Sequence, residues 1–391
     1  MSKKLFTLIV CMLGFFVLAQ AQDESKIVIT GTVVDGKTNE PIAFTNIGVL
    51  GTILGTASDI DGKFKLVVPY KCAAHEIRFY AIGYQSVAMK VYEGKDKPEL
   101  VIKMEPIAYG LAQVDVYGEL LVYKKMLRNV VDHISENYID QPYNYVGYLK
   151  YVTNRDSIHK MKEAVVTIYD AEGYHRSNPE TTFRNIGYTY NQVRRNQQPA
   201  SVLDGLTDMD DILTADIIRN TRNVLDISNS RDYKLQSKGV LLYEGDSVHV
   251  IAYTVTKPSI STTGVYGVKT YSGEIYIHLK DWAVLKNVMN ITAEDYNVLG
   301  RNLVTIGEAA KKNVKMTYTT TYKKLRDVYF LSGVNVDYSY QEDGQNVKGR
   351  MEFITTKVNM NSPTVIEGRT YYEDIKENPD FWNQYSAYFE E

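Results

Sequence analysis

The sequence has 391 residues, 44 of them basic and 47 acidic, and a formal net charge of −3 at neutral pH. A mildly acidic chain has no global electrostatic attraction for nucleic acid or anionic lipid, so the composition argues against both as partners. The length allows two domains, each with its own hydrophobic core. The 32 tyrosines favour a protein dominated by β-sheet, because tyrosine suits half-buried pleated surfaces.

Residues 1–21 have the composition of an export signal. Two lysines precede a short apolar run, and the sequence Ala-Gln-Ala at its end supplies the small residues that a signal peptidase needs. The apolar run is shorter than a membrane-spanning helix. Cys11 lies in the middle of that run, which is a poor match to a lipoprotein cleavage site. We expect an exported mature chain that begins near Gln22, carries no lipid anchor and lies in the periplasm or at the outer membrane.

Processing near Gln22 leaves 42 basic and 47 acidic residues, a net charge near −5, together with a single cysteine. The mature fold is therefore expected to have no internal disulfide, although exported proteins often contain them. We interpret the remaining thiol, Cys72, as a small buried apolar side chain beside a strand.

The residues that follow the export signal alternate apolar side chains with turn-forming ones, as paired antiparallel strands require. Residues 31–35 lead into a turn, Pro41 stands before a second strand, and residues 59–62, Asp-Ile-Asp-Gly, predict a hairpin turn. These phrases resemble the carboxypeptidase regulatory-like domain of Bacteroidetes cell-envelope proteins, as in the N-terminal extensions of TonB-dependent receptors. The resemblance implies a seven-stranded-type β-sandwich, similar to transthyretin (prealbumin), over residues 22–117, and a domain that performs no chemistry.

An amphipathic helix is predicted over about residues 119–139, where it opens a second domain of residues 118–391. Apolar residues recur there at steps of three and four, while charged residues occupy the opposite side. The apolar positions are Leu120, Tyr123, Leu127, Val130, Val131, Ile134 and Tyr138. Pro142 follows, as expected just beyond the end of a helix.

The rest of the second domain is predicted to be mostly β, with one or two short helices between residues 202 and 224. Several of its short sequence motifs resemble those of the β-rich region that follows a regulatory-like domain in Bacteroidetes envelope proteins. Its predicted arrangement of strands and helices is similar to that of the LolA-like half-barrel. The matching phrases are residues 134–138, 163–166, 273–277 and 380–382. The expected fold class is mainly β with a few helices, a sandwich followed by a curled, half-barrel-like antiparallel sheet with helices against one face.

A zinc hydrolase is one alternative that the sequence raises. His133 and Glu136 have the local spacing of a metallocarboxypeptidase ligand pair, with His249 or His278 available as a third ligand. Both lie on the polar side of the predicted helix, however, where a solvated pair three residues apart is commonplace. We therefore expect no catalytic residues, no metal and no cofactor.

Other catalytic or ion-binding motifs find little support. Asp59 and Asp61 begin like a calcium loop, but strand-like residues follow where further oxygen ligands are needed, so a hairpin turn is favoured. The sequence has no Gly-x-Ser-x-Gly elbow and no glycine-rich loop that opens a helix. We expect that its polar side chains do not converge into a reactive centre.

Tyrosines of the curled sheet are candidates for ligand contacts. They either line a concave apolar face or simply pack across strands, and the second alternative is the more ordinary one. The candidates are Tyr253, Tyr276, Tyr318, Tyr322, Tyr338 and Tyr340. Ser157 and Ser247 each lie in an Asp-Ser-apolar triplet, which matches the pattern of O-glycosylation in Bacteroidetes.

These observations predict a non-enzymatic, exported cell-envelope protein with a binding or scaffolding role near the outer membrane. The sandwich is expected to be a docking or spacer module. The expected partner is another envelope protein or an outer-membrane component, with an apolar ligand or a glycan as further candidates and no nucleic acid. One alternative is a carrier of an apolar ligand or lipid in the half-barrel, and another is the zinc hydrolase.

Overall fold

The computed structural model describes residues 26–52, 54–59, 61–95, 97–107, 116–155, 158–176, 186–195, 209–220, 222–265, 267–295 and 311–385. The predicted export signal and Ser157 lie outside the described residues. Among the helices of the described residues, none is both long and apolar enough to cross a membrane.

The first part of the chain forms a sandwich of two small sheets, with strand orders β4-β1-β7 and β3-β2-β5-β6. Alternate residues of β1 and β4 are buried, as the period of a half-buried strand requires. The bounds are β1 Lys26–Asp35, β2 Asn46–Val49, β3 Gly55–Ala57, β4 Lys63–Pro69, β5 Glu76–Tyr80, β6 Val87–Lys90 and β7 Leu100–Met104, with the short helix α2 at Val91–Gly94. The predicted seven-stranded type of sandwich is therefore confirmed.

The core and turns of the sandwich follow from its sequence. The rings of Phe64 and Phe79 meet edge to face at 5.4 Å between the sheets, and Cys72 is buried in the same core as expected. The turn before β4 is held by Asp59, whose Oδ1 accepts a hydrogen bond from Lys63 N at 2.7 Å. Gly62 has a φ of +72°, a conformation that glycine adopts without strain. The predicted turn is therefore present, but it joins β3 and β4 of different sheets and is not the hairpin turn that the sequence suggested.

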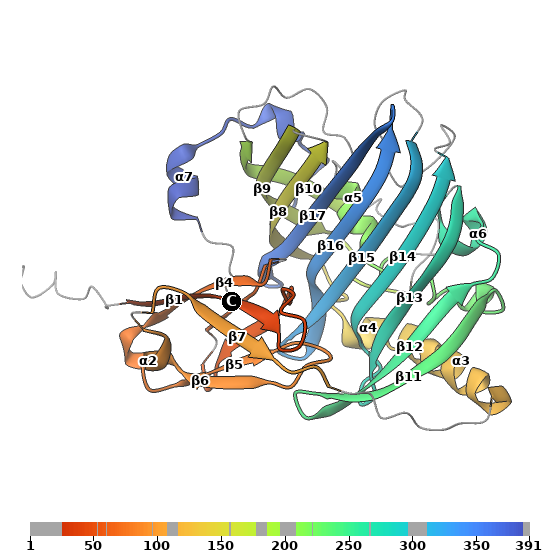
Figure 1. Ribbon diagram of the computed structural model, residues 1–391, viewed down its shortest axis with the longest axis horizontal. Coiled ribbons are helices and arrows are strands. Elements are labelled where there is room, and N and C mark those ends of the chain that lie inside the picture. Colours follow the sequence, from red (N-terminus) through yellow and green to blue (C-terminus); the bar gives the residue numbers. More distant parts are fainter. Residues whose placement is uncertain are drawn as a thin grey trace, which may run out of the picture.

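The second part of the chain forms one ten-stranded sheet in the order β10-β9-β8-β17-β16-β15-β14-β13-β12-β11 (Figure 1). All neighbours are antiparallel, and the last strand, β17, pairs with β8 on one side and β16 on the other. The bounds are β8 Tyr143–Arg155, β9 Ile158–Asp170, β10 Ile186–Arg195, β11 Tyr233–Tyr243, β12 Asp246–Val255, β13 Val268–His278, β14 Val284–Asp295, β15 Lys311–Leu325, β16 Val328–Glu342 and β17 Gln345–Asn359.

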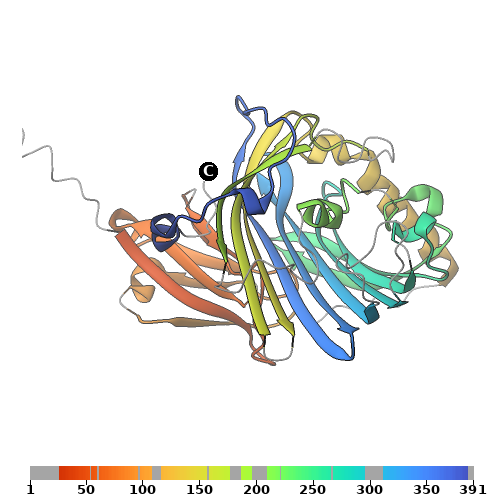
Figure 2. The same cartoon turned by 90° about the horizontal axis from the view of Figure 1, so that it is seen from above.

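The large sheet curls, so that it has a concave inner face and a convex outer face (Figure 2). Register shifts within several strand pairs, such as the one at Thr321 and Tyr322, add the local twist that bends a sheet. Helices α3 Val116–Asp132, α4 Ile134–Asn137, α5 Met209–Ala215 and α6 Ile260–Thr263 lie on the inner side. The sandwich and helix α7, Pro379–Gln384, lie against the outer side. The prediction of a mainly β fold with a curled antiparallel sheet is confirmed.

The predicted helices differ from the observed ones in length. The expected helix at about 119–139 is divided at His133, whose φ of −103° and ψ of 10° are not helical. Within the described part of residues 202–224, helix α5 ends at Ala215. Side chains then bond to nearby backbone in competition with a helix, because Asp216 accepts from Ile218 N and Asn223 donates to Ile217 O.

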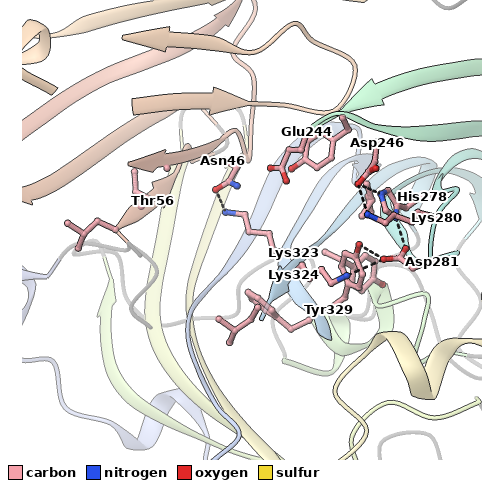
Figure 3. Close-up of a pocket in the computed structure, with 18 of the residues that line it drawn as sticks. Asn46, Thr56, Glu244, Asp246, His278, Lys280, Asp281, Lys323, Lys324 and Tyr329 are labelled. Carbon is pink, nitrogen blue, oxygen red and sulfur yellow. Dashed lines mark hydrogen bonds and ion pairs between the residues drawn. The ribbon is translucent and has the colours of Figure 1, made fainter. Parts of the chain in front are cut away.

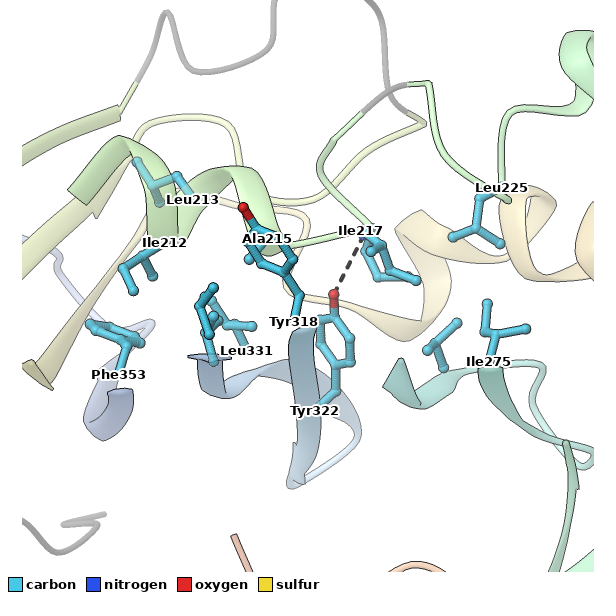
Figure 4. Close-up of a cluster of buried hydrophobic side chains, with 14 of the residues drawn as sticks. Ile212, Leu213, Ala215, Ile217, Leu225, Ile275, Tyr318, Tyr322, Leu331 and Phe353 are labelled. Carbon is cyan, nitrogen blue, oxygen red and sulfur yellow. Dashed lines mark hydrogen bonds between the residues drawn. The ribbon is translucent and has the colours of Figure 1, made fainter. Parts of the chain in front are cut away.

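Helix α5 and the segment after it fill the inner face of the sheet (Figure 4). Ile212 and Leu213 of α5 have no exposed surface, and Ile217 is 3% exposed. Figure 4 shows these side chains facing Tyr318 and Phe353 of the sheet. A ligand on this face would therefore have to displace the chain's own apolar residues.

A buried polar network holds that segment in place. Asp216 accepts hydrogen bonds from the hydroxyls of Tyr174 and Tyr322, at 2.7 and 2.6 Å. Three residues on, Arg219 forms an ion pair of 2.6 Å with Asp170, at the end of β9. Both carboxylates are 1% exposed, and buried charges are tolerated when they are paired and hydrogen-bonded in this way. The network therefore ties the segment after α5 to the sheet.

Candidate binding site between the sandwich and the large sheet

The sandwich contacts the outer face of the large sheet through aromatic side chains. A Cβ added to Gly333 of β16 would lie 3.1 Å from Cδ1 of Phe44, so the glycine allows the Phe44 ring to come close to the strand. The rings of Tyr80 and Tyr243 lie 6.4 Å apart, edge to face, across the same interface. These contacts frame the spaces that remain between the two layers.

One of these spaces is a pocket of about 470 Å³, which we call the large interdomain pocket (Figure 3). Asn46 and Gly48 of β2 and Thr56 of β3 form its wall on the sandwich side. The large sheet supplies charged side chains from three hairpin ends. These are Glu244, Asp246, His278, Lys280, Asp281, Lys323 and Lys324.

Tight turns place two of these charged groups. Glu244 and Gly245 join β11 to β12 with φ values of +53° and +92°, the left-handed conformation of a two-residue hairpin turn. Glutamate rarely adopts that conformation, and here it lies at the rim of the pocket. The turn from β13 to β14 carries Asp281 and ends at Trp282, whose φ is +64°.

His278 lies between two carboxylates. Its Nδ1 is 2.6 Å from Oδ1 of Asp281, and its Nε2 is 3.4 Å from Oδ2 of Asp246. The hydrogen bond to Asp281 raises the pKa of His278 above its usual value, although burial opposes the rise. Because both ring nitrogens face carboxylates, the imidazolium form is favoured, and a protonated imidazole is no general base.

Asp281 is the centre of this network. Its Oδ2 accepts a hydrogen bond from the Tyr329 hydroxyl at 3.0 Å and from Lys324 Nζ at 3.3 Å. Burial alone would raise the pKa of Asp281, but the hydrogen bonds from His278 and from Ala283 N outweigh it and hold the pKa well below the usual range. Asp281 is therefore a stable carboxylate that organises its neighbours.

Lys323 and Glu244 also line the large interdomain pocket, and burial shifts the pKa of each. Nζ of Lys323 donates to Oδ1 of Asn46 at 3.2 Å, a contact between β15 and β2. Burial lowers the pKa of Lys323 to about 8, although the charge of Glu244 opposes this. Burial also raises the pKa of Glu244, against the hydrogen bond from Tyr243 and the charge of Lys323. Both groups are thus shifted toward their neutral forms.

A second, smaller space of about 220 Å³ adjoins the first, and we call it the small interdomain pocket. The two pockets share Asn46, Tyr243 and Lys323 in their linings. Lys286 of β14 lines the small pocket, and burial lowers the pKa of this lysine as well. The two pockets together make a polar site bounded by both layers.

Comparison with known proteins identifies the sandwich. Residues 29–116 match the family model of the CarboxypepD_reg-like domain. The regulatory-like domain predicted from the sequence is therefore confirmed over these residues. No curated protein matches the chain.

Three of the solved structures that resemble the chain have sequence identities of 10% or less. A LolA superfamily protein from Nitrosomonas europaea has 10% identity and a TM-score of 0.23, with 62% of this chain and 94% of that chain covered. A DUF1329 family protein from Desulfovibrio piger has 9% identity and a TM-score of 0.27, with 64% and 96% covered. A structure named as an outer membrane lipoprotein-sorting protein domain, from Vibrio parahaemolyticus, has 8% identity and a TM-score of 0.25, with 63% and 93% covered. LolA-like proteins are thus among those that the chain resembles, as predicted.

The sequence did not predict the interdomain pockets, since the expectation was that polar side chains do not converge into a reactive centre. The fold brings His278 and Asp281 of one hairpin and Lys323 of another to one pocket. That these groups form no reactive centre stays a prediction. The signals in the sequence were faint. A histidine three residues before an aspartate at a turn, and a Glu-Gly pair between two strands, each occur for purely structural reasons.

The predicted ligand-facing tyrosines are divided between the two faces of the sheet. The buried ones on the inner face are Tyr253, Tyr318, Tyr322, Tyr338 and Tyr340. Partners within the chain already engage several of them, since the Tyr253 hydroxyl donates to Asn287 and that of Tyr322 donates to Asp216. Tyr276 lies on the outer face, where Nζ of Lys286 is 5.4 Å from its ring. Their role as ligand contacts stays a prediction.

The remaining candidates lie apart from one another. Nε2 of His133 is 3.9 Å from Glu136 on the surface, while His249 packs against the ring of Tyr123. Within the ranges given above, no three His, Cys, Asp or Glu side chains are grouped to hold a metal. Ser247 lies at the start of β12, half-buried beside the Glu244 turn, and its glycosylation stays a prediction.

Proposed function

We propose that this chain is a non-enzymatic, exported cell-envelope protein that binds a small polar ligand between its sandwich and its large sheet. The observation that carries the proposal is the large interdomain pocket of about 470 Å³, to which both layers contribute side chains. Concave sites with a few converging polar groups are where proteins bind small ligands. The pocket holds charged groups of both signs, which suits a ligand that has both acceptors and donors.

The chemistry of the pocket supports binding over catalysis. Both ring nitrogens of His278 are occupied by carboxylates, and Asp281 is already bonded to Tyr329 and Lys324. A nucleophilic mechanism needs a base with a free nitrogen beside a hydroxyl or thiol. Groups that are satisfied by one another recognise a ligand by charge and shape, without taking its protons.

The sandwich then has two roles in this proposal. It is a docking module for another envelope protein or an outer-membrane component, and it also forms one wall of the ligand site through Asn46 and Gly48. We infer that residues 22–117 form this domain and residues 118–391 the second, after removal of residues 1–21 on export. N-terminal sequencing of the secreted protein tests the last point, with Gln22 as the expected first residue.

Filling the pocket tests the proposed site. A Cβ added to Gly48 meets nothing within 4 Å, so Gly48→Phe places a ring in the pocket without a backbone clash. Val101→Phe, at a position on the sandwich that is 62% exposed, is the matched control. Native mass spectrometry of protein purified from exporting cells is expected to show a bound small molecule in the wild type and in Val101→Phe, and none in Gly48→Phe.

The same variants allow a second readout. A thermal-shift panel of amino acids, short peptides, sugars and sugar acids is expected to stabilise the wild type and the control but not the filled variant. A wild type that retains no molecule and responds to no compound would contradict the proposal. So would turnover of any compound in the panel, because the site is proposed to bind without reaction.

A further inference from the structure

Two lysines under the sandwich bring positive charge into the interface without an anionic partner. Lys286 and Lys323 both line the small interdomain pocket, and neither forms an ion pair with a residue that the structure describes. Lys323 Nζ contacts the amide oxygen of Asn46 at 3.2 Å, and Lys286 Nζ lies 5.4 Å from the ring of Tyr276. These neutral contacts leave both charges uncompensated at short range.

The sheet register places the two lysines side by side. Lys286 is paired with Thr321 across β14 and β15, and Lys323 follows Thr321 by two residues. Residues two apart on a strand share a face, so the lysines are diagonal neighbours on the outer face. The hydroxyls of Thr321 and Ser332, 3.1 Å apart, line the same pocket. Two ammonium groups and two hydroxyls thus surround one space.

An unpaired ammonium is unfavourable even where it is only half-buried, as both lysines are, and both respond to that cost. Burial lowers the pKa of Lys323 to about 8, although Glu244 opposes this, and it lowers the pKa of Lys286, although Glu274 opposes that. Neither acidic residue is close enough for an ion pair with its lysine. An anion in the small pocket would supply the missing partner and restore the charged form of both amines.

We infer that the ligand of the interdomain site is a small organic acid whose carboxylate binds between Lys286 and Lys323. The inference rests on the proposed function. Two ammonium groups donate charge-assisted hydrogen bonds to the carboxylate oxygens, the strongest kind of polar contact in proteins. The rest of the ligand extends into the large pocket, where the carboxylates of Glu244 and Asp246 can accept further hydrogen bonds. The hydroxyls of a sugar acid or the amino group of a short peptide can donate them.

Matched pairs of compounds test the inference by calorimetric titration of the mature protein. D-glucuronate is compared with D-glucose, and the dipeptide alanyl-alanine with its C-terminal amide, so that each pair differs in the carboxylate. One acid is expected to bind at millimolar concentration or below, and its neutral counterpart about tenfold or more weakly. The acid that binds identifies the source of the carboxylate, a sugar or a peptide.

The double variant Lys286→Met and Lys323→Met removes both charges while keeping side chains of similar length. Its affinity for the acid is expected to fall to that of the neutral counterpart. The control is Lys234→Met, which changes an exposed lysine of β11 outside both pockets and is expected to bind like the wild type. Removing unpaired, half-buried charges does not weaken the fold, so the melting temperature of the double variant is expected to be no lower than that of the wild type.

Three results would overturn the inference: equal binding of an acid and its neutral counterpart, unchanged acid binding in the double variant, or no binding of either acid. Failure of the inference differs from failure of the proposed function. If neutral compounds bind and Gly48→Phe prevents their binding, the proposed binding site is correct, but the proposal that its ligand is a carboxylate is wrong. If Gly48→Phe changes no binding at all, the site itself is wrong.

Discussion

Nζ of Lys323 donates a hydrogen bond to Oδ1 of Asn46 over 3.2 Å, and this contact joins the middle of the large sheet to the sandwich. The two residues are 277 positions apart in the sequence. The amide supplies one acceptor but no negative charge. The half-buried lysine is therefore held in place without being neutralised, which has consequences for both stability and binding.

The first prediction concerns Lys323→Met without ligand. Burial lowers the pKa of Lys323 to about 8, so the folded state binds this proton less well than the unfolded chain does. The free energy of unfolding of the wild type is therefore reduced below about pH 8, and the loss disappears as the pH rises toward about 10.5. We expect the variant to be about 1–2 kcal/mol more stable than the wild type at neutral pH, after allowance for the lost hydrogen bond to Asn46.

Urea unfolding at several pH values measures this difference, and Lys324→Met is the control. The Lys324 side chain is 43% exposed and its ammonium pairs with Asp281 at 3.3 Å, so its removal is expected to give no gain. If Lys323→Met is less stable than the wild type at neutral pH, the Lys323 ammonium is not an uncompensated charge in the folded protein.

The second prediction compares His278 and His249, whose pKa values are shifted in opposite directions. The pKa of His278 is raised, mainly by its hydrogen bond to Asp281, whereas burial lowers the pKa of His249. A raised pKa contributes stability below about pH 6.5 that is lost as the pH rises through the higher folded-state value. A lowered pKa has the opposite effect, since folding becomes less favourable as the pH falls below about 6.5.

We therefore expect His278→Gln to destabilise the protein more at about pH 6 than at about pH 9, because only the acidic condition keeps the imidazolium. His249→Gln is expected to show the reverse trend, with its relative stability improving at acidic pH. Chemical denaturation of both variants at the two pH values measures the trends. Parallel pH profiles would contradict the proposed charge state of His278.

The sandwich could be predicted from the sequence because its turns depend on residues that are close together in the chain. Asp59 and Gly62 specify a tight turn whichever residues lie beyond it, and that turn is observed. The turn crosses from one sheet to the other, so the predicted pairing of its two strands as a hairpin is wrong. The fold class of the large sheet could also be predicted, since alternating apolar residues predict strands. The face of the sheet on which each tyrosine lies was harder to predict. Ile275, Tyr276 and Ile277 are all apolar, and such a run does not reveal that its middle member faces outward.

The interdomain pockets depend on relationships that no local pattern contains. Lys286 and Lys323 become neighbours through the register of β14 and β15, and Asn46 reaches them because the sandwich docks on that face. The same holds for the inner face. The periodicity around Ile212 correctly predicts a helix, but only the fold shows that this helix fills the concave side of the sheet.

The third prediction concerns a glycine inside a strand. A Cβ added to Gly147 of β8 would lie 2.1 Å from Cε2 of Phe353, so the ring lies directly over the glycine. Gly147→Ala is expected to destabilise the protein by about 2–3 kcal/mol, because a fully buried ring must move. Gly48→Ala is the control, since the added Cβ meets nothing within 4 Å and is expected to change stability little. Equal melting temperatures for the two variants would contradict the packing described for β8 and β17.

The fourth prediction concerns the network that closes the inner face. Asp216 is 1% exposed and accepts hydrogen bonds from Tyr174 and Tyr322, while Arg219 nearby pairs with Asp170. Asp216→Asn keeps the shape but removes the charge and sets an amide group against one of the hydroxyl donors. We expect a loss of about 3 kcal/mol in the free energy of unfolding, since breaking a buried charged network leaves its partners unsatisfied.

The variant is also expected to loosen the segment after α5 and to expose apolar side chains such as Ile217. Binding of a hydrophobic dye at neutral pH, before global unfolding, measures this exposure. Asp226→Asn is the control, because Asp226 caps a short turn at the surface through Ser228 and contacts none of this network. If Asp216→Asn binds no more dye than the control, then α5 is held by its apolar contacts alone. In that case the polar network does not hold the inner face closed.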